Sequence, residues 1–87
     1  MILDPSYMDD CIEILEVQLD REERELQAKK AGLAKMRAKF EQDRNTLSND
    51  VIWEVSSFLD AKEYEVNRKL LTIKEEKEAL QRRRDTK

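Results

Sequence analysis

The stretch DRNTLSNDVIW, residues 43–53, lies at the middle of an 87-residue chain and decides its fold. An apolar heptad series ends here at Leu47, and a second series begins at Ile52, five residues later instead of seven. The side chains between them are mostly polar and compete for backbone hydrogen bonds, which favours turns and helix caps. The stretch therefore predicts either a turn that folds two helices together or a weak point in one long helix.

Both halves of the chain carry an apolar residue at every seventh position. The first series is Ile12, Leu19, Leu26, Leu33, Phe40 and Leu47, and the second is Ile52, Leu59, Val66, Ile73 and Leu80. The companion positions three residues later are mixed: Met8, Leu15, Glu22, Lys29 and Met36, then Val55, Lys62, Lys69, Glu76 and Arg83. Heptads sustained in this way predict long, coiled-coil-like α-helices.

Each half also has its own helix start signal. Asp4 is a suitable N-cap before Pro5, a residue favoured at the first helical position. Ser48 repeats the cap, and Leu47 is placed to contact Ile52 across the first turn. We expect one all-α domain over 1–87, with helices at about 5–43 and 49–84 and a turn at about 44–48.

The charges form four blocks that favour an antiparallel arrangement. Residues 4–25 carry a net −7, 29–44 carry +4, 50–65 carry −4, and 66–87 carry +4. Folding at about residue 47 places each block beside one of opposite sign, whereas a parallel, in-register homodimer places each block beside itself. Single surface ion pairs add little stability, but a repeated sign match selects the orientation.

Two antiparallel structures satisfy this pattern equally well. In a hairpin, or in an antiparallel dimer of unbroken helices roughly 120 Å long, the opposed residues have numbers that add up to about 95. The opposed pairs include Phe40 with Val55, Met36 with Leu59, and Leu15 with Leu80. The start signal at Ser48 favours the hairpin. The stretch contains no Gly or Pro, so an unbroken long helix is still an alternative.

Apolar residues make up 39% of the chain and charged residues 43%, which supplies a narrow seam but no thick core. Domains this small usually need a staple or a partner. We therefore predict an interaction surface near the tip, which either a second copy, forming a four-helix bundle, or another protein covers. It comprises Met36, Phe40, Val51, Trp53, Val55, Phe58, Leu59 and Tyr64. The first helix also has a small outer face, formed by Ala28, Ala31, Gly32, Ala34 and Ala38.

The composition argues against an enzyme, a metal site or a bound cofactor. The chain has no histidine, one cysteine and one glycine, so the usual general base, zinc site and phosphate-binding loop lack their residues. Acidic runs such as MDDCIEILE are typical of solvated helix faces. A two-helix hairpin is also expected to lack the roughly 300 Å³ concavity of a ligand site. Cys11 is interpreted as a small, partly buried apolar residue.

The basic C-terminus, with Arg82, Arg83 and Arg84, is the strongest feature for nucleic-acid binding. Basic residues are also expected at a helix C-terminus, where they interact favourably with the helix dipole, and the whole chain has a formal charge of −3. We expect no nucleic acid as a partner. No membrane span or secretory signal is visible in the sequence, and the lone cysteine fits a reducing compartment, so we expect a cytoplasmic protein.

These observations predict a non-catalytic interaction module, a small subunit or adaptor of a multiprotein assembly. A homodimer is expected, although the choice between a second copy and a different protein stays open. A second interpretation is a small helical chaperone that masks an amphipathic helix of a client protein. An RNA-binding hairpin dimer that uses the three arginines is the weakest interpretation.

Overall fold

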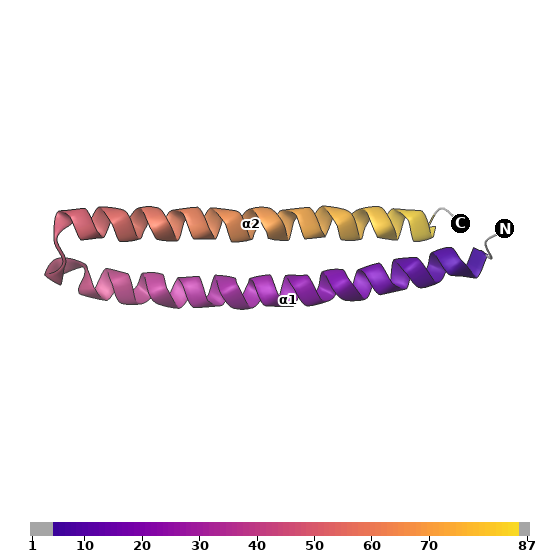
Figure 1. Ribbon diagram of the computed structural model, residues 1–87, viewed down its shortest axis with the longest axis horizontal. Coiled ribbons are helices and arrows are strands. Elements are labelled where there is room, and N and C mark those ends of the chain that lie inside the picture. The colour runs from indigo at the N-terminus through magenta and orange to yellow at the C-terminus, as the bar shows by residue number, and fades with distance from the viewer. Residues whose placement is uncertain (1–4, 86–87) are drawn as a thin grey trace.

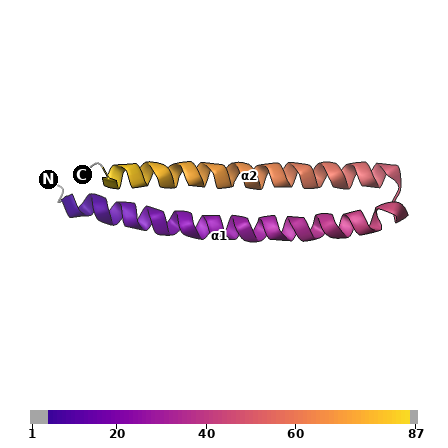
Figure 2. The ribbon, with the colours of Figure 1, turned by 180° about the vertical axis from the view of Figure 1, so that it is seen from behind.

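The protein is a helical hairpin, as predicted. The structure, a computed structural model, describes residues 5–85 and consists of α1 (Pro5–Asp43), the short 3-10 helix η1 (Arg44–Thr46) and α2 (Asn49–Asp85). The two long helices run antiparallel and side by side, as Figure 1 shows, and Figure 2 shows the same arrangement from behind. The predicted cap Asp4 lies outside the described residues.

The tip of the hairpin forms without glycine. The Thr46 hydroxyl donates to the Asp43 carbonyl oxygen at 2.7 Å, and this bond closes the last turn before the chain extends at Leu47. Ser48 then caps α2, because its Oγ accepts from the Val51 N–H at 3.4 Å. Within residues 5–85 no backbone φ is positive, so side-chain caps and one extended residue reverse the chain. The polar stretch is therefore a turn, and the molecule is 67 Å long instead of roughly 120 Å.

The core is a single row of apolar side chains between the helices. Its buried members all come from the two heptad series: Ile12, Leu19, Leu26, Phe40, Leu59, Val66 and Ile73. The central four, Leu19, Leu26, Val66 and Ile73, form one cluster, and Leu33, Leu70 and Leu80 pack against it. This thin core leaves most of both helices exposed to solvent.

The flank of each helix that turns toward the partner helix differs from the prediction. Glu23, Arg37, Glu63 and Lys77, which form interhelical ion pairs, lie four residues after a core-row residue instead of three. The expected companion residues Glu22, Lys29, Lys69 and Glu76 are exposed, while Glu23, Arg37, Glu63 and Lys77 are partly buried. Positions three and four residues after the core row flank it on opposite sides of a helix. Apolar spacing alone therefore could not show which flank faces the partner helix.

Candidate interaction surface

Interhelical ion pairs close one side of the seam, which we call the paired side. Near the tip, Arg37 of α1 bonds two carboxylates of α2, with 2.7 Å from Nε to Glu63 Oε1 and 2.6 Å from Nη2 to Asp60 Oδ1. These hydrogen bonds, with Glu63 contributing most, raise the pKa of Arg37 above its ordinary value. The guanidinium therefore stays charged and clamps the two helices together.

The other half of the paired side repeats this arrangement with the signs exchanged. Lys77 of α2 bonds Asp20 of α1 and lies 3.2 Å from Glu23 Oε2, measured from Nζ. The hydrogen bond to Asp20 raises the pKa of Lys77, and the same bond lowers the pKa of Asp20. Farther along, Arg84 Nη2 lies 3.4 Å from Glu16 Oε1. The opposed charge blocks predicted from the sequence thus meet in the structure.

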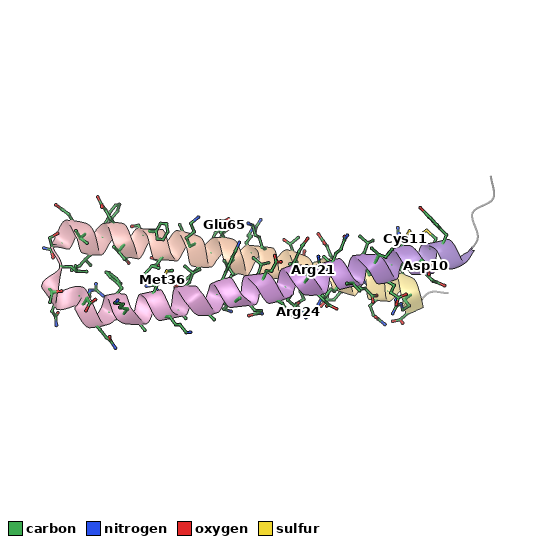
Figure 3. All side chains as sticks on the ribbon, turned by 60° about the horizontal axis from the view of Figure 1, so that its bottom comes forward. Asp10, Cys11, Arg21, Arg24, Met36 and Glu65 are labelled. Carbon is green, nitrogen blue, oxygen red and sulfur yellow. The ribbon has the colours of Figure 1, made fainter. Side chains whose placement is uncertain are left out.

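The opposite side of the seam is hollowed along its length, and we call it the open groove. Two adjoining hollows of about 360 and 380 Å³ form it. Its lining is Glu22, Glu25, Leu26, Lys29, Gly32, Leu33 and Met36 of α1 and Lys62, Glu65, Val66, Arg68, Lys69, Thr72, Ile73 and Glu76 of α2. Figure 3 labels Met36 and Glu65, one from each helix. The expectation that the hairpin has no concavity of roughly 300 Å³ was therefore wrong.

Charge is unevenly distributed along the open groove. The half nearer the tip carries Lys29, Lys62 and Lys69, and the half nearer the helix termini carries Glu22, Glu25 and Glu76. The half nearer the tip also holds Arg68 and one acidic side chain, Glu65. Glu65 lies 3.1 Å from Lys69 Nζ, which lowers the pKa of that carboxyl. Among the residues that line the groove, no ion pair joins the two helices.

Two of the eight predicted contact residues are not on the surface. Phe40 and Leu59 are buried, with only 7% and 2% of their surface exposed, because both belong to the core row. They support the surface from beneath and cannot contact a partner in this fold. Val55 is half-buried, whereas Met36, Val51 and Phe58 are exposed. Lys62 covers part of the Phe58 ring, with 5.8 Å from Nζ to the ring centre.

Trp53 and Tyr64 lie on a different side of α2 from Phe58. They follow one another by eleven residues, and Leu71 follows by seven more, so all three fall on one line along the helix. We call Trp53, Tyr64 and Leu71 the outer stripe. Trp53 is 72% exposed and Tyr64 67%. The predicted interaction surface therefore includes aromatic rings from two separate sides of α2, with Phe58 on one and Trp53 and Tyr64 on the other.

Sequence reasoning missed several exposed apolar residues. Tyr7, Ile14 and Val17 are exposed on the outer face of α1, and Leu71 extends the outer stripe of α2. All of them lie outside the heptad series, so a search for large apolar residues outside the series would have found them. Gly32, expected on the small outer face of α1, lines the open groove instead.

The arginines and the cysteine lie toward the end of the hairpin opposite the tip. Arg84 is engaged by Glu16, and Arg82 is exposed. Figure 3 shows Cys11 near this end, where its thiol is free and its side chain is half-buried. The prediction about nucleic acid stays a prediction.

The described part of the chain offers no metal-binding group of three or more histidine, cysteine, aspartate or glutamate side chains. Neither described helix combines the length and the apolar character that a membrane span requires. No protein-family model, curated protein or solved structure matches the chain. The function of the chain is therefore inferred from its exposed surfaces.

Proposed function

We propose that this protein is a non-catalytic interaction module, a small helical subunit or adaptor of a multiprotein assembly. The outer stripe carries this proposal. Trp53 and Tyr64 expose most of their surface from one line of a long helix whose own core is a single row. Aromatic side chains are the most frequent anchors of protein interfaces, because they bury a large apolar area with few rotatable bonds.

A photo-crosslinking experiment tests the proposal. A photoreactive phenylalanine derivative replaces Trp53 or Tyr64 in the full chain, in cells that naturally make the protein. We expect each position to form an adduct of one defined mass with a protein partner that mass spectrometry identifies. The matched control places the same group at Lys35, an exposed polar position on α1. Equal adduct patterns at all three positions would contradict an interface at the outer stripe.

The open groove supports a second candidate, a chaperone for an amphipathic client helix. Its floor is apolar, formed by Leu26, Leu33, Val66 and Ile73, and its rims are charged. Helix-in-groove binding uses this combination. A chaperone is expected to be partly unfolded alone and to gain stability with its client, whereas a subunit should unfold cooperatively without one. Far-ultraviolet circular dichroism during urea unfolding separates the two.

A further inference from the structure

We infer that the open groove is a self-association surface on which a second copy of the hairpin packs antiparallel, with the two tips at opposite ends. This inference deepens the proposed function by assigning one partner and its orientation. The two sides of the seam differ in their interhelical ion pairs. Ion pairs of Arg37, Lys77 and Arg84 bridge the paired side, whereas among the described residues that line the open groove no ion pair joins the two helices.

The charges of the groove are self-complementary about its centre. Lys29 lies three residues after Leu26 and Glu22 four residues before it. A twofold axis that passes beside Leu26 therefore brings Lys29 of one copy against the partner's Glu22, and Glu22 against the partner's Lys29. Such an interface is isologous, because each contact occurs twice.

The second helix has the same symmetry about the same point. Lys69 lies four residues before Ile73 and Glu76 three residues after it, so Lys69 meets the partner's Glu76. Leu26 and Ile73 belong to the same core cluster and line the same hollow, so the two centres lie close together along the hairpin. Among the described residues, Glu22 and Glu76 form no ion pair, and Lys29 interacts with Glu65 of α2 only as the smallest of the causes that lower the pKa of that carboxyl.

The apolar residues of α1 follow the same pairing. Leu15, Glu22, Lys29 and Met36 share one line on the helix, because they are seven residues apart. The axis that pairs Lys29 with the partner's Glu22 also places Met36 against the partner's Leu15. Both side chains are exposed in the single hairpin. Like charges approach at two places. Beside the axis Glu25 comes near the partner's Glu25, and toward the ends Lys62 comes near the partner's Arg83; all of these side chains are exposed to solvent.

The alternative packing, groove to groove with the tips together, has the opposite charge pattern. It places α1 of one copy over α2 of the other, so that Lys29 meets the partner's Lys69 and Glu22 meets the partner's Glu76. Like charges juxtaposed at an interface weaken association strongly. The charge distribution therefore selects the antiparallel dimer.

Disulfide crosslinking tests the orientation. In a Cys11→Ser background, one protein carries Leu15→Cys and a second carries Met36→Cys, and the two are mixed under mild oxidation. We expect a crosslinked heterodimer to accumulate faster than in either protein alone. The control mixture combines the Met36→Cys and Lys62→Cys proteins, whose cysteines approach only in the parallel packing. Faster crosslinking in the control mixture, or none in either mixture, would overturn the inference.

Charge reversal tests the face. The pair Glu22→Lys and Glu76→Lys makes the groove predominantly basic, with Glu25 and Glu65 as its remaining acids. We expect self-association, measured by sedimentation equilibrium, to weaken on the order of tenfold or more. Mixing this variant with a Lys29→Glu and Lys69→Glu variant should restore association. The control Glu54→Lys and Glu78→Lys changes the net charge equally at exposed positions outside the groove and should not weaken association.

Unchanged association of the basic-groove variant, or a wild-type protein that stays monomeric, would overturn the self-association surface. Neither result would affect the proposed function. Photo-crosslinking from Trp53 and Tyr64 tests that proposal separately, because the outer stripe lies outside the groove.

Discussion

Arg37 of α1 donates to Glu63 of α2, with 2.7 Å between Nε and Oε1. The two residues are 26 positions apart in the sequence, and the contact fixes the register of the helices near the tip. A bidentate or forked arginine contact is more directional than a lysine contact. In a hairpin whose core is one row of side chains, such contacts determine how far one helix slides along the other.

Charge reversal at this contact should destabilise the hairpin, and reversal of both partners should restore part of the loss. Arg37→Glu places a third carboxylate beside Glu63 and Asp60, so we expect a lower melting temperature by circular dichroism. The double variant Arg37→Glu, Glu63→Arg regains one favourable pair. Lys35→Glu, at an exposed position, is the control and should change little. If Arg37→Glu and the control Lys35→Glu lower the melting temperature equally, the contact does not set the register.

Removal of a core side chain should have a much larger effect. Leu59 is the most buried residue of the core row, and Leu59→Ala is expected to lower the free energy of unfolding by about 2 to 5 kcal/mol. Leu71→Ala makes the same chemical change at an exposed position of α2, where about 0.5 kcal/mol or less is expected. Urea titration at a fixed protein concentration measures both. Similar losses would indicate that Leu71 is also covered in solution.

The two helices and the turn were predictable because the signals for them are local. The heptad rows, the cap at Ser48 and the charge blocks all act within a few residues or between whole helices. The inward-facing flanks and the exposed surfaces were not predictable in the same way, because they depend on how each helix is rotated about its own axis. Glu22 and Glu23 are adjacent in the sequence, yet one lines the open groove and the other pairs with Lys77. A rotation of one helix about its axis exchanges such neighbours, and apolar spacing alone is insensitive to it.

Stability should vary with pH only at the acidic and alkaline extremes. Hydrogen bonds to Lys77 and Lys69 hold the pKa values of Asp20 and Glu65 below their ordinary values of 3.8 and 4.5, so the folded state binds fewer protons than the unfolded state. Their contribution is present above those ordinary values and is lost as the pH falls below them.

At alkaline pH the free energy of unfolding should change in the opposite direction, falling as the pH rises. The pKa of Lys77 is raised above its ordinary value of 10.5, so its contribution is present below that value and is lost at higher pH. With no histidine in the chain, we expect a flat profile of unfolding free energy from about pH 5 to pH 10. Asp20→Asn should reduce the loss of unfolding free energy at acidic pH. A marked slope near neutral pH would contradict this account.

The cap at the tip should contribute measurably. Ser48 Oγ accepts from the Val51 N–H at 3.4 Å, a long bond, so Ser48→Ala is expected to cost about 0.5 to 1 kcal/mol, the lower part of the range for N-caps. Ser57→Ala is the matched control, because Ser57 is exposed within α2. Alanine is the better helix former there, so Ser57→Ala should be neutral or slightly stabilising. Equal losses in urea titrations would show that Ser48 does not act as a cap.

Gly32→Ala should stabilise the hairpin. Gly32 lies in the middle of α1, and a Cβ added there meets no other atom within 4 Å. Its backbone is helical, so alanine removes the excess conformational freedom of the unfolded chain without strain, and we expect a gain of about 0.5 to 1 kcal/mol in unfolding free energy. The variant Gly32→Trp fills part of the open groove. Comparing its stability with that of Gly32→Ala separates the effect of helix propensity from the effect of side-chain bulk in the groove. If Gly32→Ala lowers stability at high protein concentration but raises it at low concentration, the added methyl group is meeting a second molecule in the groove.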